Sequence, residues 1–318
     1  MTEGFNMGTH KKVGFIGTGT MGVGMALNLR KTGAQLFAYD LHQANQQELS
    51  AAGVVWVDSV AEVGRVSDVV FSSLPGPKEV QEVGLGQGGL IASMRPGTAW
   101  FDLSTNSTSV VREISKQFAD RGITVLDAPV SGGPSGARSG KLAMYIGGDR
   151  EAFERHRHLL NSMGDRVIYV GGIGAGSTAK IVHNLIALTT RMAVAEGMSL
   201  GVKAGLDPVE LWNAVRQGAI GRSRTLDTLA EKYLCATYDQ PTFALRLAYK
   251  DFNLAMDLAH EFEVPMPIGD VAHQDYKTAM ERGWDDLDSK IPMNLQNERA
   301  GVEVRASAEA LKNMLARD

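Results

Sequence analysis

The residues Lys180, His183 and Asn184 lie close together in the chain and could form a site for proton transfer. Positions three and four apart share one face of an α-helix, so these side chains should point in the same direction. Partial burial lowers the pKa of a lysine towards neutrality, and such an amine can act as acid or base between an alcohol and a carbonyl. The alternative is a solvated lysine on a surface turn, which is the more common situation for a lysine considered alone.

A glycine-rich segment near the N-terminus predicts the binding of a dinucleotide. It follows a strand-like run at 12–16 and precedes a helix-like run at 23–31, so its glycines fall in the turn between strand and helix. The first glycine of this motif permits the turn, the second lets the backbone approach a pyrophosphate, and the third lets helix and strand pack closely. The helix N-terminus then presents unpaired amides to the phosphates. The cofactor-binding residues predicted in this segment are Gly17, Gly19, Thr20, Met21 and Gly22.

The acidic residue Asp40 ends the next predicted strand, at 35–39. An aspartate at this place in a dinucleotide-binding fold accepts from the ribose hydroxyls of the adenosine and repels a 2′-phosphate. The sequence therefore favours NAD over NADP, although a neighbour such as His42 could soften the discrimination. The alternative is a glycine turn that binds no nucleotide, and it leaves the accompanying strand, helix and acid unexplained.

Two further loops follow strand-like runs and should lie at the edge of the sheet where open parallel sheets bind ligands. The first contains Leu74 and Pro75, directly after a run at 66–72. The second is Ser104-Thr105-Asn106, whose small polar groups suit the ribose on the nicotinamide side of the cofactor. Such residues are also favoured helix caps, so a cap for the following helix is the alternative.

The segment from Asp127 to Ala137 is dense in glycine and serine and follows a predicted strand at 123–126. Several backbone N–H groups exposed together form a concavity that binds carboxylates. A plain flexible loop is the alternative, but a strand pattern resumes at 142–148, which favours a shaped connection.

Helix-like patterns dominate the second half of the chain, where strand patterns are scarce. Apolar residues recur at helical spacing from 179 to 202 without a proline, which predicts one long helix that links two domains. Asp207 and Pro208 form a helix start, and runs at 242–262 and 267–282 predict two more helices.

These patterns divide the 318 residues into two domains and predict an α/β fold class. Residues 1–175 form a Rossmann-type, doubly wound sheet domain, in which 1–11 is a flexible tail. Residues 176–318 form an all-α domain for substrate binding and dimerisation, and this domain starts with the long interdomain helix. The active site should lie where the two domains meet. The final segment, 291–318, is assigned no more than an amphipathic helix that could serve subunit packing.

Composition argues against several other classes of function. A net charge of −4 gives no electrostatic reason to expect nucleic acid or an anionic membrane. The single cysteine, Cys235, excludes an internal disulfide framework and suits a reducing compartment. The polar N-terminus lacks a secretory signal, and no uninterrupted apolar run reaches the ~18 residues that span a bilayer. These features predict a soluble cytoplasmic protein. The histidines and the cysteine show no cluster at metal-ligand spacing, so we also expect no metal site.

Ordered blocks of the sequence resemble the β-hydroxyacid dehydrogenases, the family of 3-hydroxyisobutyrate dehydrogenase and tartronate semialdehyde reductase, related in architecture to 6-phosphogluconate dehydrogenase. The blocks are GTGTMGVGMALNL at 17–29, DLST at 102–105, DAPVSGGPSGARSGKLAMYIGG at 127–148, GAGSTAKIVHN at 174–184 and, more weakly, KDFNLA at 250–255. The resemblance implies an NAD(P)-dependent dehydrogenase that assembles as a homodimer or homotetramer and transfers a hydride to or from the β-carbon of a small 3-hydroxy acid.

The resemblance also implies a role for each residue of the site. It assigns Lys180 and Asn184 to catalysis, Ser131, Gly132, Gly133 and His183 to substrate binding, and Lys250 to the cofactor. In this mechanism neutral Lys180 takes the hydroxyl proton as hydride leaves the β-carbon, and the charged amine returns it in the reduction. His183 is the least specific of these assignments, because a histidine on a helix face is more often a structural group than a catalyst.

Departures from the family pattern limit the substrate. His183 stands where the hydroxyisobutyrate branch usually has asparagine, as in the phosphogluconate branch, but Ala187 replaces the glutamate that assists decarboxylation there. The chain is also much shorter than that branch, so 6-phosphogluconate is disfavoured. An imine reductase of similar architecture and a relative that only binds nucleotide are the alternatives. Both are expected to lack the amine that Lys180 provides.

Arg222 and Arg224 occupy a loop that has two interpretations. The planar guanidinium group of arginine, with its paired N–H donors, suits a second anionic group on the substrate, such as a carboxylate, phosphate or sulfonate. A solvated loop is the commoner situation for arginine and remains the favoured interpretation.

Overall fold

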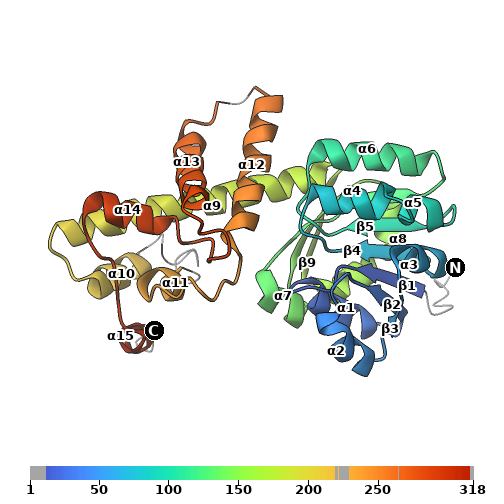
Figure 1. Ribbon diagram of the computed structural model, residues 1–318, viewed down its shortest axis with the longest axis horizontal. Helices are drawn as coiled ribbons and strands as arrows, with labels where there is room; N and C mark the ends of the chain where they lie inside the picture. The colour runs from blue at the N-terminus through green and yellow to red at the C-terminus, as the bar shows by residue number, and fades with distance from the viewer. Residues whose placement is uncertain (1–11, 219–220, 222–228, 264, 316–318) are drawn as a thin grey trace, which may run out of the picture. The chain divides into compact units, whose positions relative to one another are not determined.

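The computed structural model describes residues 12–218, 221, 229–263 and 265–315, so Arg222 and Arg224 lie outside the described residues. The chain divides into two compact units, Met1–Lys180 and Ile181–Asp318. The first unit is a sheet with helices on both faces, and the second is built from helices (Figure 1). The predicted fold class, a Rossmann-type α/β domain followed by a long helix and a helical domain, is confirmed.

Within the described residues, the first unit is built on a nine-stranded sheet with the order β3-β2-β1-β4-β5-β6-β8-β7, and β9 pairs with β8. The six strands from β3 to β6 run parallel, whereas β8 runs antiparallel to β6 and β7. The order reverses between β1 and β4, the kind of point at which open α/β sheets bind ligands. The strands are β1 (Lys12–Ile16), β2 (Gln35–Tyr39), β3 (Val55–Trp56), β4 (Val69–Ser72), β5 (Ala99–Asp102), β6 (Thr124–Asp127), β7 (Val130–Ser131), β8 (Ala143–Gly147) and β9 (Arg166–Gly171).

Helices cover both faces of this sheet (Figure 1). One face packs against α1, α2, α7 and α8, and the other packs against α3, α4, α5 and α6. The helices are α1 (Gly22–Arg30), α2 (Gln46–Ala51) with a 3-10 turn before it (Gln43–Asn45), α3 (Val60–Val66), α4 (Pro77–Leu85), α5 (Leu90–Ser93), α6 (Thr108–Ala119), α7 (Gly133–Ser139) and α8 (Arg150–Met163).

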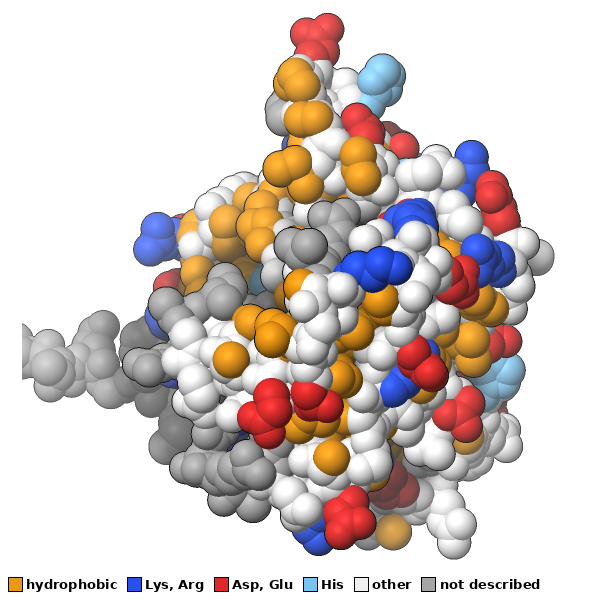
Figure 2. All heavy atoms as spheres, turned by 90° about the vertical axis from the view of Figure 1, so that its left-hand side faces the viewer, with side chains coloured by type: hydrophobic (Ala, Val, Ile, Leu, Met, Phe, Trp, Pro, Cys, Tyr) orange, Lys and Arg blue, Asp and Glu red, His pale blue; other side chains and the backbone are white. Residues whose placement is uncertain are grey.

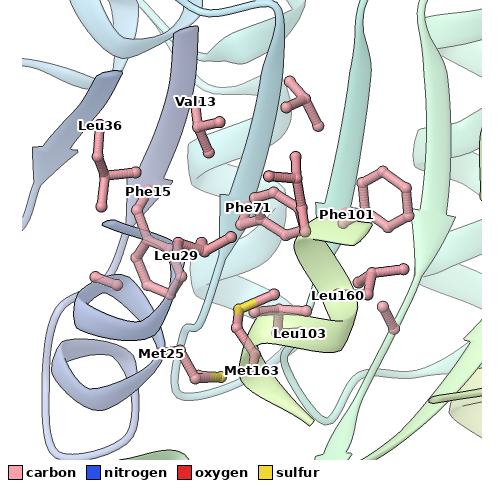
Figure 3. Packing of buried hydrophobic residues seen from close by; sticks show 14 of the residues in the cluster. Val13, Phe15, Met25, Leu29, Leu36, Phe71, Phe101, Leu103, Leu160 and Met163 are labelled. Carbon is pink, nitrogen blue, oxygen red and sulfur yellow. The ribbon is translucent and has the colours of Figure 1, made fainter. Parts of the chain in front are cut away.

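Large apolar side chains fix the sheet against its helices. Phe15, Phe71 and Phe101 come from neighbouring strands and are fully buried, and Leu29 of α1 and Leu160 of α8 pack into the same cluster (Figure 3). The rings of Phe71 and Phe101 stack with their centroids 5.2 Å apart. Each such side chain contributes about 1.5–3 kcal/mol on burial. This packing holds the parallel strands in register, so their carboxyl ends form one edge.

The second unit consists of helices around its own apolar core. Helix α9 runs unbroken from the first unit into the second, and Asp207 begins α10 by accepting from two backbone amides at 2.9 and 3.0 Å, which confirms the predicted helix start. The helices are α9 (Ala175–Lys203), α10 (Pro208–Gln217), α11 (Ala230–Leu234), α12 (Leu245–Glu261), α13 (Pro267–Glu281), α14 (Met293–Ala300) and α15 (Ala308–Leu315).

Apolar surface is exposed on the second unit. Figure 2 shows hydrophobic side chains on the projecting pair α12 and α13, where Phe262, Ile268 and Val271 are 59%, 72% and 66% exposed. Val182 and Ile186 are also exposed on α9. By length and composition alone α9 could cross a membrane, a weak criterion that core helices of soluble proteins also meet. Exposed apolar patches of this kind are typical of surfaces that another protein covers.

The structure corrects the sequence-based boundaries in three places. Within the described part of the final segment, 291–315, the chain forms two helices, α14 and α15, because Gly301 adopts the left-handed conformation (φ 61°) that ends a helix. The expected loop after Asp127 contains strand β7 and helix α7, and Pro134 lies in the first turn of that helix. The predicted strand at 66–72 starts only at Val69, since α3 continues to the first residue of that run.

Candidate active site

The turn between β1 and α1 has the backbone geometry that its glycines were expected to provide. Gly17 has a φ of 86°, and a Cβ at Gly22 would collide with the carbonyl oxygen of Gly17. In contrast, a Cβ at Gly19 would meet no atom within 4 Å. Thr20 is exposed, and Met21 precedes α1 without a side-chain cap. The turn therefore leaves open space and helix amides where a pyrophosphate would bind.

Asp40 at the end of β2 is tied to this turn. Its carboxylate accepts from the backbone N–H of Thr18 at 2.6 Å and from that of His42 at 2.8 Å. Asn45 donates to the carbonyl oxygen of Thr18 at 2.7 Å, which fixes the same residue from the other side. Each carboxylate oxygen has a second lone pair, so Asp40 can hold the turn and still accept from ribose hydroxyls.

The buried carboxylate of Asp102 organises the next two loops. It accepts from the hydroxyl of Ser72 at 3.0 Å, from the backbone N–H of Ser104 at 3.2 Å and from the amide of Asn106 at 3.0 Å. The hydroxyl of Ser104 in turn accepts from the backbone N–H of Leu74 at 2.9 Å. Burial raises the pKa of Asp102, and these hydrogen bonds oppose the rise.

This network places Leu74, Pro75 and Thr105 at the carboxyl edge of β4 and β5, next to the glycine turn. Ser104 and Asn106 are used to order the loops, and the cap position of α6 is Ser107, which makes no side-chain capping bond. The alternative that the 104–106 loop caps the helix is therefore wrong.

Helix α9 is anchored to the sheet by Asp127, the last residue of β6. The two carboxylate oxygens of Asp127 accept from the backbone N–H groups of Gly174 at 2.8 Å and Ser177 at 2.6 Å, at the start of the helix. Burial raises the pKa of Asp127, and the amide hydrogen bonds oppose the rise. A Cβ at Gly176 would lie 2.7 Å from the carbonyl oxygen of Asp127, so helix and sheet are in backbone contact. Lys180, 8% exposed, lies one turn further along this helix.

The loop between β7 and α7 is the expected carboxylate site. Ser131 pairs with Ala143 of β8, and its hydroxyl shares a hydrogen bond with the phenol of Tyr145. Gly132 and Gly133 have φ angles of 135° and 62°, which side chains rarely adopt. Burial raises the pKa of the Tyr145 phenol, and the hydrogen bond with Ser131 opposes the rise.

In the second unit, Asp251 of α12 joins two of the predicted site residues. Its carboxylate accepts from the side-chain amide of Asn184 at 2.6 Å and pairs with the ammonium of Lys250 at 2.6 Å. The Nδ1 atom of His183 lies 3.0 Å from Oδ1 of Asn184. Because the amide nitrogen of Asn184 donates to Asp251, its oxygen must accept, and His183 therefore carries its proton on Nδ1.

Loss of Asp251 should destabilise the second unit. Asp251 is 3% exposed, and Asp251→Ala would leave a buried amide and a partly buried ammonium without their acceptor. We expect a loss of about 3 kcal/mol in the free energy of unfolding, measured by urea denaturation. Asp257→Ala, an exposed acid on the same helix, is the matched control. An Asp251→Ala protein as stable as this control would contradict the assignment.

The structure thus groups the predicted residues by unit. The cofactor residues of the first unit lie along one edge of the sheet, Lys180 ends that unit, and His183, Asn184 and Lys250 belong to the second. The three organising carboxylates, Asp102, Asp127 and Asp251, were not singled out from the sequence. Within the described residues no three side chains of His, Cys, Asp or Glu are arranged to hold a metal ion.

Comparisons with known proteins cover both units. Residues 12–171 match the family model described as the NAD binding domain of 6-phosphogluconate dehydrogenase. Residues 174–295 match the model described as NAD-binding of NADP-dependent 3-hydroxyisobutyrate dehydrogenase.

Curated relatives match over nearly their whole length. The 2-(hydroxymethyl)glutarate dehydrogenase of Eubacterium barkeri is 34% identical over 293 residues, which cover 92% of this chain and 97% of that protein. The 2-hydroxy-3-oxopropionate reductase of Escherichia coli strain K12 is 34% identical over 277 residues, covering 87% and 94%. Among solved structures, a 3-hydroxyisobutyrate dehydrogenase of Mycobacterium tuberculosis with L-serine is similar at a TM-score of 0.79 and 29% identity, covering 90% of this chain and 99% of that one.

Proposed function

The chain belongs to the β-hydroxyacid dehydrogenase family and is an NAD(P)-dependent oxidoreductase of hydroxy acids, and from this premise we propose that Lys180 is its general acid and base. The observation that carries the proposal is the placement of Lys180, buried on a helix that Asp127 anchors to the end of β6. The reaction interconverts a small 3-hydroxy acid and the corresponding semialdehyde.

The substrate carboxylate binds at the loop between β7 and α7. The hydroxyl of Ser131 and the backbone N–H groups of Gly132 and Gly133 donate to its oxygens, and the left-handed conformation of both glycines supports this role. The phenol of Tyr145 engages the Ser131 hydroxyl and so limits its rotation. The loop fixes one end of the substrate and leaves its β-carbon to be presented to the nicotinamide.

The proton moves between the β-hydroxyl and the amine of Lys180. In the oxidation, neutral Lys180 removes the hydroxyl proton while the O–H electrons form the carbonyl and hydride leaves the β-carbon. In the reduction, the ammonium returns that proton to the oxygen. The nicotinamide supplies the hydride acceptor or donor when it is bound. Asn184, oriented by Asp251 and His183, positions the lysine and the hydroxyl. Lys250, which pairs with Asp251, is the proposed cofactor-binding residue of the second unit.

NAD is the proposed cofactor in preference to NADP. The carboxylate of Asp40 is held against the glycine turn, where it would meet a 2′-phosphate with like charge. We expect Asp40→Asn to reduce the ratio of kcat/KM for NAD to that for NADP by about tenfold or more, since juxtaposed like charges cost several kcal/mol. Asp58→Asn, an exposed acid of the same unit, should leave the ratio unchanged. A wild-type enzyme that prefers NADP would contradict the proposal.

A substrate panel tests the proposed reaction. Reduction of NAD and NADP is followed by absorbance with 3-hydroxyisobutyrate, L-serine and threonate as substrates. Oxidation of NADH and NADPH is followed with tartronate semialdehyde and with a cyclic imine. Turnover of a 3-hydroxy acid or its semialdehyde, without turnover of the imine, supports the proposal. Turnover of the imine alone would favour the imine reductase alternative, and no turnover at all would favour a protein that only binds nucleotide.

Assembly and location complete the proposal. We propose a homodimer or homotetramer, which the apolar surface on α9, α12 and α13 supports. A cytoplasmic location is supported by the cysteine content, since a chain with the single cysteine Cys235 suits a reducing compartment. Cys235 is half-buried, and burial raises the pKa of its thiol, so it makes a poor thiolate.

A further inference from the structure

Two residues of α1 that the dinucleotide motif does not require, Gly24 and Asn28, face helix α7. They lie four residues apart and so share one face of α1, and both are buried. A Cβ at Gly24 would lie 2.8 Å from the backbone carbon of Ala137 and 2.8 Å from the backbone nitrogen of Arg138. The two helices are therefore in backbone contact at this position, which no other residue type allows.

Asn28 bonds the C-terminal end of α7. Its side-chain amide donates to the carbonyl oxygen of Ala137 at 2.7 Å and to that of Arg138 at 3.3 Å. Carbonyl groups in the last turn of a helix have no partner within the helix, so these two depend on the side chain of Asn28. The oxygen of Asn28 accepts from the ammonium of Lys31 at 2.7 Å, which fixes the orientation of the amide.

The position of Asn28 separates it from the cofactor. It lies six residues beyond Gly22, which places it about 9 Å along the axis of α1 from the end that faces the pyrophosphate. Helix α7, however, begins at Gly133, directly after Ser131 and Gly132 of the carboxylate loop. A displacement of this short helix moves the carboxylate loop with it.

We propose that Gly24 and Asn28 are positioning residues that set the distance between the dinucleotide helix and the carboxylate loop, and so determine the affinity for the hydroxy acid. The proposal rests on the proposed function, since it takes the loop at 131–133 as the carboxylate site. Neither residue contacts a reacting atom. Asn28, the asparagine of the sequence block at 17–29, thus connects the helix that binds the dinucleotide to the loop that binds the carboxylate of the hydroxy acid.

The test is Asn28→Asp, which keeps the size and the acceptor for Lys31 but removes the donor to α7. With the hydroxy acid that the substrate panel identifies, we expect KM to rise by about tenfold or more, because a displacement of 1 Å is enough for effects of this size. The Kd for NADH, measured by fluorescence titration, should stay at the wild-type value. Gly24→Ala should give the same pattern by pushing α7 away. Arg30→Ala is the control on the same helix and should change neither constant, because the Arg30 side chain donates to the carbonyl oxygen of Gly53 rather than to α7.

Each outcome decides the question. A wild-type KM in a folded, active Asn28→Asp enzyme overturns the proposal, as does an equal rise in the KM for the hydroxy acid and the Kd for NADH. If neither Asn28→Asp nor Gly24→Ala gives folded protein, the contact serves stability and the proposal is wrong. Failure of the proposed function would appear elsewhere, as a wild-type protein that turns over no member of the panel.

Discussion

Replacement of Lys180 with alanine is expected to reduce turnover of the hydroxy acid by a factor of about 10² to 10⁴, the contribution typical of positioned proton transfer. Lys180 is buried on α9 and lies outside the turn between β1 and α1, so the Kd for NADH should not change. Turnover is measured under saturating cofactor by absorbance, and binding by fluorescence titration. A small primary amine such as methylamine should restore part of the activity if the missing group is a proton carrier.

Lys203→Ala is the matched control. Lys203 lies on the same helix, and its exposed ammonium donates to the carbonyl oxygen of Ala300 at 3.1 Å. This variant should retain wild-type turnover. Near-normal activity in Lys180→Ala would remove the basis for the proposed mechanism, whereas loss of NADH binding along with activity would assign the lysine to the cofactor.

Gly19→Ala should separate cofactor binding from folding. A Cβ at Gly19 meets no protein atom within 4 Å, so the free protein should fold and melt as the wild type does. The added methyl group would occupy the space where the pyrophosphate approaches the backbone. Loss of one or two charge-assisted hydrogen bonds to the phosphates should raise the Kd for NADH by on the order of tenfold to a hundredfold.

Gly22→Ala provides the contrast within the same motif. Its Cβ would collide with the carbonyl oxygen of Gly17, so this variant should unfold at a lower temperature even without ligand. Calorimetry and NADH titration of both proteins are the measurements. Wild-type affinity for NADH in Gly19→Ala would show that the cofactor does not lie on this turn.

Much of the fold could be predicted because its elements are long and marked by clear signals. Strands β1 and β2 begin and end at the residues predicted for them, and α13 matches its predicted range to within one residue. Strands β3 and β7 have two residues each, too few to show a period. They were missed because pairing with neighbours, rather than local sequence, defines them.

The site was predictable where a residue type reveals its own chemistry. A lysine beside an asparagine and a glycine motif after a strand can be recognised from the chain alone. Asp127 cannot, because its role arises from amides 47 and 50 residues away. The same holds for Asp251, which bonds Asn184 across 67 residues. Only the folded chain brings these carboxylates to their partners, so their contacts could not be predicted from the sequence.

The backbone contact between α9 and the sheet has a consequence for the precision of the lysine. Lysine has four side-chain torsions and is among the most mobile of residues in solution. Here the main chain at the start of its helix is tied to β6 by two short hydrogen bonds and touches it directly at Gly176, so the sheet fixes the backbone that carries the lysine. Burial of the Lys180 side chain restricts its own torsions as well. A residue type that is usually mobile therefore holds its amine at a defined position.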